Sequence, residues 1–279
     1  EIMTSKEFLT SDFLTSKKFL MSKKFLTSTI FLTSNICLTS KKLLTSKHFL
    51  TSIFFDVNKL FLRQWYEVSS KEMETSCVNR DESVEAGVRW FPYIKGGPYR
   101  KWYGNNDFVV NWKNDGEDIR KYISERPEKQ VGGRLVNMDC FFKQCLAWSK
   151  VSSSSFSSRY YPAGSIFSDA SNGGFGAFDD IRKSLLLLNT SIVSEILALI
   201  SPTVNFGAGD VGKLPVKLQC ANPHIFDELL LISQEDWDNS ELSWDFKRLE
   251  LCASWNGQSS LETNYCELRL DWQAKINRT

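Results

Sequence analysis

The residue types best suited to chemistry lie between Arg89 and Asn106, a stretch of this 279-residue chain that carries no acidic side chain. Cations on glycine-flanked strands beside aromatic rings are suited to phosphate contact and base stacking. An ordinary β-hairpin with its basic side chains in solvent would show the same pattern, so the residues alone leave both interpretations open. The cations are Arg89, Lys95, Arg100 and Lys101, and the interleaved aromatic residues are Trp90, Tyr93, Tyr99, Trp102 and Tyr103.

A second candidate surface lies around a run of serines. Ala147–Val151 and Phe156–Tyr161 are typical of two short strands, and Ser152–Ser155 forms the turn between them. Lys150 and Arg159 could face a ligand from this turn. A solvated loop without a ligand explains the same residues.

Other chemistries have little support. The chain has two histidines, His48 and His224, which excludes a histidine-rich metal site and leaves no convincing pair of nucleophile and base. Its seven cysteines include no CxxC motif, and an odd number without a signal peptide indicates reduced thiols in a cytoplasm. We therefore expect neither a metal site nor an independent enzyme.

The spacing Gly207-x-Gly209-x-x-Gly212 matches the dinucleotide-binding loop formally. That loop needs a strand before it and a helix after it. Here an expected helix ending at Pro202 precedes it, and Lys213-Leu-Pro-Val216 follows. The context favours a turn that enters a β segment, and not a cofactor loop.

The elements that would position these residues can be placed along the chain. Tyr99–Tyr103 and Asp107–Trp112 are expected to pair as strands, with turns at Gly96-Gly97-Pro98 and Gly104-Asn105-Asn106. Ile181–Ile200 is the strongest helix, with Asp179 and Asp180 as N-cap candidates and Pro202 at its end. Its apolar face is expected to comprise Leu185, Leu188, Ile192, Ile196 and Leu199.

Three further segments have local signals. Lys59–Val68 fits a strand or a short helix, and Asn79–Gly87 is expected to form an acidic helix that ends at Gly87. Ile225–Ser233 is expected to be helical. No uncharged apolar stretch reaches the roughly 18 residues of a membrane helix, and the formal net charge of +1 excludes a uniformly basic surface.

Residues 4–55 repeat a hexapeptide of the type TSKKFL, and one copy is a residue short. A period of six gives no apolar stripe on a helix and no apolar face on a strand, so we expect poorly ordered chain at 1–55. A parallel β-solenoid is the regular alternative. The chain begins at Glu1, which indicates a fragment or a processed end.

Several long segments resemble the target-recognition region of large adenine-specific DNA methyltransferases, in particular the PglX-like enzymes of bacteriophage-exclusion (BREX) systems. The resemblance covers about residues 56–250. Ala147 before Trp148-Ser149 and Ser201 before Pro202 depart from the family pattern, and 132–145 follows it loosely. The matching segments are Lys59–Val68, Lys95–Asn106, Val110–Glu117, Ile200–Phe206, Asp210–Pro215, Ser233–Asp238 and Ser243–Arg248.

The resemblance implies a division of labour. Enzymes of this family join the recognition region to a catalytic domain that binds S-adenosylmethionine and takes the flipped adenine at an Asn-Pro-Pro-aromatic motif. This chain has no such motif, since Asn222-Pro223 is followed by His224. We therefore expect no cofactor site and no methyl transfer by the chain alone, with duplex DNA, a separate methyltransferase domain and other defence subunits as partners and no membrane.

Together these observations predict an α+β domain at 56–250, in which Ile181–Ile200 packs on a twisted antiparallel sheet, between the repeat at 1–55 and a tail at 251–279. Its function would be sequence-specific recognition of duplex DNA for an adenine-N6 methyltransferase. The alternative is a non-catalytic remnant or scaffold that binds no DNA. Arg100, Lys101 and Arg159 are candidates for phosphates or guanine edges, and Asn105 and Asn106 for adenine edges. The full set of expected DNA contacts is Lys95, Arg100, Lys101, Trp102, Tyr103, Asn105, Asn106, Lys150 and Arg159.

Overall fold

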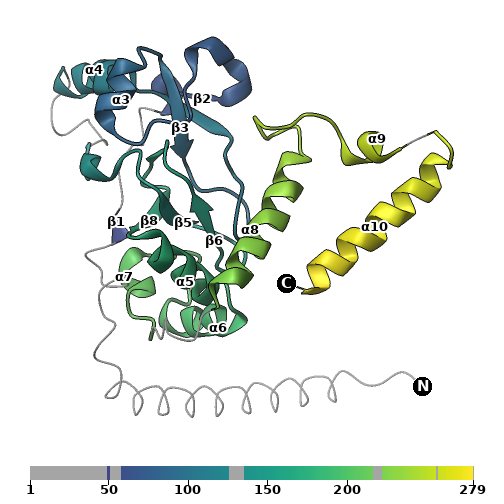
Figure 1. Ribbon diagram of the computed structural model, residues 1–279. Coiled ribbons are helices and arrows are strands. Elements are labelled where there is room, and N and C mark those ends of the chain that lie inside the picture. Colours follow the sequence, from purple (N-terminus) through teal and green to yellow (C-terminus); the bar gives the residue numbers. More distant parts are fainter. Residues whose placement is uncertain (1–48, 51–57, 126–134, 216–221, 256, 279) are drawn as a thin grey trace, which may run out of the picture. The chain divides into compact units, whose positions relative to one another are not determined.

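The chain folds as a mixed α and β structure with two small sheets (Figure 1). The computed structural model describes residues 49–50, 58–125, 135–215, 222–255 and 257–278. The predicted repeat at 1–55 lies outside these ranges apart from residues 49–50. The α+β expectation is confirmed, but two sheets replace the single sheet that the sequence suggested.

The first sheet has the strand order β2-β4-β3-β7. Its strands are β2 (Leu62–Gln64), β4 (Phe108–Asn111), β3 (Trp90–Ile94) and β7 (Ile166–Phe167). The pairs β2–β4 and β4–β3 are antiparallel, whereas β3 and β7 are parallel. The expectation of a purely antiparallel sheet is therefore wrong for this half of the fold.

The predicted hairpin between Tyr99–Tyr103 and Asp107–Trp112 is also wrong in one arm. The strand at 108–111 exists, but its partners are β2 and β3. Pro92 lies inside β3 opposite Val109, and β7 pairs only with the two residues that follow Pro92. The missing N–H of Pro92 therefore costs no bond to β7, and the segment can serve as a strand.

The second sheet has the order β1-β8-β5-β6, and all its pairs are antiparallel. The predicted strand pair around the serines is confirmed, with Cys145 opposite Tyr161 and Trp148 opposite Ser158. The strands are β1 (Phe49–Leu50), β8 (Ser171–Phe175), β5 (Cys145–Ser149) and β6 (Ser158–Tyr161).

Aromatic side chains form much of the core. Phe91 meets Phe142 edge-on at 5.5 Å, and Phe141 meets both Trp112 and Phe167 in the same way. All five rings are almost fully buried. Edge-to-face pairs of this kind add about 0.5–1.5 kcal/mol each to the burial of their area, so the core holds the strand ends in fixed positions.

Short helices adjoin the first sheet (Figure 1). The predicted acidic helix is confirmed as α3 (Arg80–Glu85), capped by Asn79, with Gly87 at a φ of 64° just beyond it. Its neighbour α4 (Lys113–Ser124) opens with a left-handed turn at residues 114–116. The remaining helical segments here are α2 (Asn58–Phe61), η1 (Trp65–Glu67), η2 (Ser70–Glu72) and η3 (Met138–Cys140).

The helix predicted at 181–200 is two helices, α5 (Phe178–Leu188) and α6 (Ser191–Ile200), bent by 76°. The break occurs because Asn189 turns its side chain to β6 and Thr190 caps the second helix. The bend also changes the buried face, since Ile192 is 69% exposed while Val193 and Leu197 are buried. Among the described residues no single helix could span a membrane by length and hydropathy, and α5 with α6 meets that test only as a bent pair.

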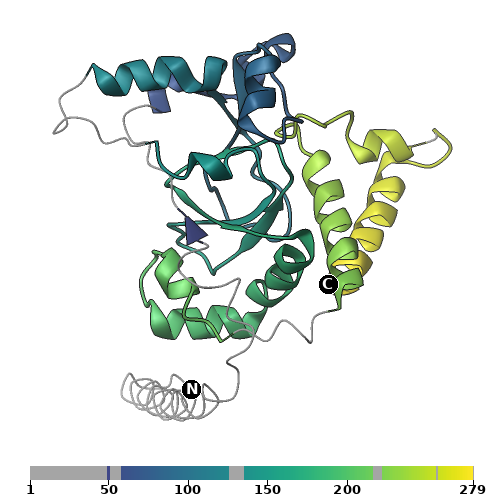
Figure 2. The same cartoon turned by 60° about the vertical axis from the view of Figure 1, so that its left-hand side comes forward.

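The C-terminal part is helical (Figure 2). The predicted helix near 225–233 is confirmed and is longer, as α8 (Pro223–Asp238), with Asn222 as its N-cap and Pro223 in its first turn. It packs against α5 and buries Phe226, Leu229 and Trp237. The other elements are α7 (Ala208–Val211), α9 (Glu250–Ser254) and α10 (Leu261–Arg278).

Candidate nucleic-acid interface

The acid-free segment forms most of a loop, residues 95–107, that joins β3 to β4. Several of its residues have left-handed backbones, among them Trp102 at a φ of 69° and Asn105 at 62°. A Cβ atom on Gly97 would lie 2.7 Å from the Asn105 side chain, and one on Gly104 would lie 2.5 Å from Arg100. The loop is therefore folded closely on itself, and these two positions require glycine.

The side chain of Arg159 lies beneath this loop and is 0% exposed. Its guanidinium donates three hydrogen bonds: Nε to the Tyr161 hydroxyl at 3.0 Å, Nη1 to the Arg100 carbonyl at 3.2 Å and Nη2 to Ser149 Oγ at 3.2 Å. Ser149 on β5 and Tyr161 on β6 can both meet this side chain because the two strands are paired neighbours, and the Arg100 carbonyl reaches it from the loop. A buried cation is tolerated when its donors are satisfied in this way.

The two hydroxyl groups extend these contacts to the loop. Ser149 Oγ donates to the carbonyl of Gly97 at 2.8 Å, and the Tyr161 hydroxyl donates to the carbonyl of Gly104 at 3.2 Å. Backbone bonds add to them, because Trp102 N donates to Ser158 O at 3.0 Å and Tyr160 N donates to Trp102 O at 2.7 Å. The loop is thus tied to the second sheet at its start, middle and end.

Asp107 is the acid at the end of the loop. Its carboxylate is partly buried, and Oδ1 has no hydrogen-bond partner. Burial raises the pKa of Asp107, while the charges of Arg100 and Arg159 oppose that rise. The Arg159 charge is therefore partly balanced through space.

Arg100 is tied to an acidic helix. Its Nη1 lies 2.6 Å from Asp236 Oδ2 on α8, and its guanidinium stacks 5.1 Å from the centre of the Trp237 ring. Its side chain keeps 27% of its exposure. Because Asp236 already neutralises its charge, Arg100 has a lower value as a phosphate contact.

The structure places the nine expected DNA-contact residues in two groups. Four are buried and hold the loop: Tyr103, Asn105, Asn106 and Arg159. In this structure these four side chains contact the protein and not solvent, so direct contact with DNA by them stays a prediction. Arg159 is fully buried, and the Asn105 side chain donates to Pro98 O at 3.0 Å. Burial also raises the pKa of Tyr103 to about 12.

The other five keep partial exposure: Lys95, Arg100, Lys101, Trp102 and Lys150. Lys95 Nζ lies 4.3 Å from the centre of the Phe108 ring, and Lys101 Nζ donates to Asn189 O at 2.8 Å. Residues 97–99 of the same loop are exposed, and Tyr99 keeps 46% of its surface. Tyr99 is one of the interleaved aromatic residues but is not among the nine expected contacts.

Lys95 and Lys150, two of the three partly exposed lysines of the candidate interface, lie beside a close approach of three segments. A Cβ atom on Gly96 would lie 3.0 Å from the carbonyl of Ala170, and the backbone N–H of Lys150 donates to that same carbonyl at 2.9 Å. The backbones at Lys95 and Lys150 therefore both lie near the Ala170 carbonyl, although the two residues are 55 positions apart (150 minus 95). Asp169 precedes Ala170, so the local charge of these three side chains is +1.

Two cavities lie elsewhere, and none of the nine expected residues lines either. One, of about 490 Å³, is bordered by basic and acidic side chains together: Lys71, Arg89, Lys113, Glu72, Glu117 and Asp118. The other, of about 360 Å³, is rich in hydroxyl groups beside Phe156 and Phe206. Within the described residues no group of His, Cys, Asp and Glu could hold a metal ion.

The glycine motif at 207–212 does not follow a strand, as a dinucleotide-binding loop would. It brackets the four-residue helix α7, with Gly207 as N-cap and Gly212 as C-cap. Residues 213 and 214 follow it as a turn and a bend, and the β segment expected beyond them lies at 216–221, outside the described residues. A helix, α6, and not a strand, precedes it.

Two curated proteins are similar to this chain. An adenine-specific methyltransferase named PglX from Lacticaseibacillus casei is 37% identical over 196 residues, which is 68% of this chain and 16% of the relative. An adenine-specific methyltransferase named BrxX from Escherichia coli is 33% identical over 217 residues, 75% of this chain and 16% of the relative. The matched segment is thus about one sixth of the length of each relative. No protein-family model matches the chain.

Proposed function

This chain is homologous to a segment of the PglX-like adenine-specific methyltransferases of BREX systems, and on that premise we propose that it recognises duplex DNA for such an enzyme. The observation that carries the proposal is the 37% identity over 196 residues. The matched stretch is only about a sixth of the relative, so we expect it to carry out one of the enzyme's functions and not all of them. A recognition surface is the part that the acid-free, aromatic loop favours.

The burial of the loop residues sharpens the set of proposed contacts. Lys95 and Lys150 reach phosphates, and the exposed ring of Tyr99 contacts the sugar or base edges between them. Arg100 and Lys101 take part where DNA displaces their present partners, Asp236 and the Asn189 carbonyl. The partly exposed Trp102 is a further candidate for stacking. Tyr103, Asn105, Asn106 and Arg159 act from inside by fixing the backbone of the loop.

Methyl transfer belongs to another domain in this proposal. The chain has no Asn-Pro-Pro-aromatic sequence with which to hold a flipped adenine. S-adenosylmethionine would be the cofactor of the full enzyme, and other defence subunits would be its partners. We expect no tritium transfer from labelled S-adenosylmethionine to DNA by this chain alone, and incorporation when a separate catalytic domain is added.

The test of DNA contact is a fluorescence-anisotropy titration of the full chain with a random-sequence duplex at several salt concentrations. We expect the double substitution Lys95→Gln and Lys150→Gln to weaken binding about tenfold and to reduce the salt slope by about 2, since each lysine releases about one counterion. Tyr99→Ala should weaken binding with little change in slope.

The matched control is Lys121→Gln with Lys143→Gln, which removes the same charge from exposed positions on α4 and before β5. It should lower affinity only slightly, because a distant charge acts through the general field. Equal losses in the two double variants would reject this face as the contact. Absence of binding by the unchanged chain would reject the function itself.

The second candidate is a scaffold or remnant that binds no DNA. It is favoured by the pairing of Arg100 with Asp236, because a DNA-facing cation is already neutralised by an acidic helix. The sequence of the neighbouring DNA distinguishes the two functions. An adjoining reading frame with both methyltransferase motifs supports recognition, and interrupting stop codons support a remnant.

A further inference from the structure

The directions of the hydrogen bonds around Arg159 are fixed by its chemistry. A guanidinium has five N–H donors and no acceptor, so each hydroxyl that it meets must accept. Ser149 and Tyr161 therefore accept from Arg159, and each has its own proton left to donate. Those protons go to the carbonyls of Gly97 and Gly104.

Three carbonyl groups of one loop thus depend on one buried side chain. The carbonyl of Arg100 accepts directly, while those of Gly97 and Gly104 accept through a hydroxyl. Between the outer two anchors lie the exposed Tyr99 and the partly exposed Lys101 and Trp102. The contacts hold the segment that the proposed function assigns to DNA without meeting DNA themselves.

We infer that Arg159 is a positioning residue that fixes the shape of residues 97–104, so that its loss reduces discrimination between DNA sequences more than it reduces affinity for DNA as such. This inference rests on the proposed function. Phosphate contacts tolerate motion because they depend mainly on charge, whereas base contacts require donors and acceptors held to a fraction of an ångström. A loosened loop therefore keeps its phosphate contacts and loses its base contacts.

Lysine cannot replace arginine here. Its ammonium is a single point of charge, whereas the guanidinium spreads its donors in a plane and meets three acceptors on two strands and the loop at once. Arg159→Lys should therefore behave like Arg159→Met in the loop, although it keeps the charge. A purely electrostatic role for Arg159 would instead be rescued by lysine.

The mildest test uses two neighbours on β6. Tyr161→Phe removes the hydroxyl that links Arg159 to Gly104. Tyr160→Phe removes a hydroxyl whose one hydrogen bond within the described residues goes to Gln144, at 3.1 Å. Each variant loses one oxygen atom, so both are expected to fold. The first readout is hydrogen–deuterium exchange of the full chain without DNA, followed for amides in 96–106 and in the β3–β4 ladder.

We expect Tyr161→Phe to raise exchange in 96–106 about fivefold to tenfold, as the loss of one hydrogen bond would. Arg159→Met should raise it further, while Tyr160→Phe leaves it unchanged. Exchange in the β3–β4 ladder should stay constant in the two tyrosine variants. Equal exchange of the loop in both tyrosine variants would overturn the inference without touching the proposed function.

The second readout is selection from a random library of duplex DNA. The unchanged chain should enrich a sequence motif, and Arg159→Met and Arg159→Lys should lose most of that enrichment while affinity for the unselected library falls less than threefold. A parallel fall in both quantities would overturn the positioning role. If the unchanged chain enriches no motif, the proposed function fails together with the recognition role, even where the exchange results show that Arg159 holds the loop.

Discussion

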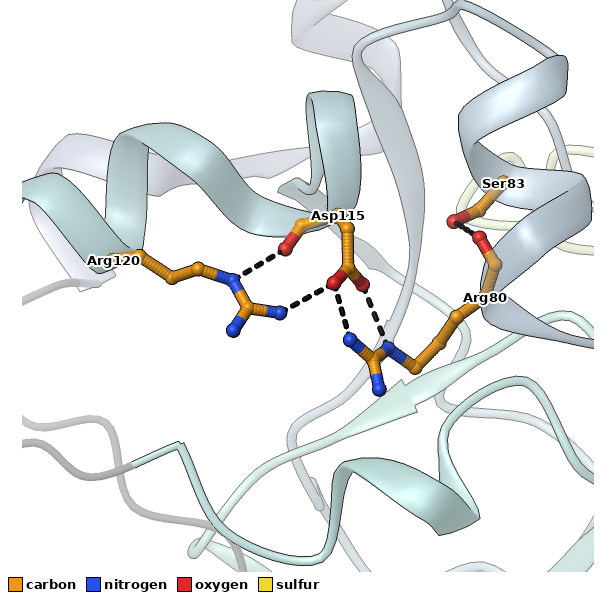
Figure 3. A network of polar contacts seen from close by, with 4 residues as sticks. All are labelled: Arg80, Ser83, Asp115 and Arg120. Carbon is orange, nitrogen blue, oxygen red and sulfur yellow. Dashed lines mark hydrogen bonds and ion pairs between the residues drawn. The ribbon is translucent and has the colours of Figure 1, made fainter.

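Two networks that contain arginine lie in different regions of this chain, and they are built in opposite ways. Near the first sheet, Asp115 lies between Arg80 and Arg120 and accepts from both guanidinium groups (Figure 3). In the second sheet, Arg159 makes its hydrogen bonds to two hydroxyls and a carbonyl. The first network pairs opposite charges, and the second satisfies one charge with neutral acceptors.

Exposure separates the two networks further. The side chains of Arg80, Asp115 and Arg120 keep 31%, 24% and 40% of their surface, whereas Arg159 keeps none. Burial by itself would raise the pKa of Asp115, but the hydrogen bonds and charges of the two arginines outweigh it and hold the pKa below its usual value. The stability that the first network provides should therefore depend on pH and salt. The stability that the second provides should depend mainly on the positions of its hydrogen-bond partners.

The largest expected effect comes from Arg159→Met. It leaves two hydroxyls and a carbonyl without their donor inside the protein, and the free energy of unfolding should fall by about 2–4 kcal/mol. The loss should persist at about pH 3, because a guanidinium stays charged at every accessible pH and Asp107 is then neutral. Urea unfolding at acidic and neutral pH measures it; a loss confined to neutral pH would mean that Arg159 acts mainly as a counter-charge.

Asp115→Asn should have a smaller effect with a different pH profile. The expected loss is about 1.5–3 kcal/mol at neutral pH, and asparagine tolerates the left-handed backbone of this position. Since the folded pKa is depressed, the carboxylate stabilises the fold above its unfolded value of about 3.9, and that contribution disappears as pH falls through the folded pKa. The difference in free energy of unfolding between the unchanged chain and Asp115→Asn should therefore disappear in acid, as urea unfolding can measure. A difference that stays constant with pH would contradict an ionic role for Asp115.

The Arg100–Asp236 pair combines features of both networks, since it joins charges but does so on the loop that Arg159 holds. Asp236→Asn should change the free energy of unfolding by less than about 1 kcal/mol, because the acid is 56% exposed. Freed Arg100 should tighten DNA binding by about twofold to fivefold and steepen its salt dependence. Asp227→Asn removes a similarly exposed acid, 53%, from the same helix and is the control; equal tightening would show only the general field.

Local signals in the sequence predicted some elements well. Asn79 and Gly87 bound an acidic helix because a side-chain cap and a left-handed stop act within a few residues. The strands β5 and β6 were predicted on either side of the serines for the same reason. By contrast, the break at Asn189 was missed because the apolar pattern continues through it, and the strand containing Pro92 was missed because proline argues against a strand.

Less of the candidate site than of the fold could be predicted from the sequence. Positive charge and aromatic residues around 95–106 predicted a loop of unusual composition, but not which side chains face inward. The burial of Arg159 depends on hydroxyls at positions 149 and 161 and on carbonyls more than 50 positions earlier. Such an arrangement arises only when the second sheet forms, so no local pattern distinguishes this arginine from one in solvent.

The open side of β6 is occupied by parts of the chain that are not regular strands. The amide of Asn189 accepts from Ser158 N at 2.9 Å and donates to Ser158 O at 2.9 Å, as a neighbouring strand would, and Trp102 bonds to the residues on either side of Arg159. An exposed strand edge can recruit a second chain and begin aggregation. The bend between α5 and α6 therefore also covers part of this edge, and replacing Asn189 would open Ser158 to pairing with another molecule.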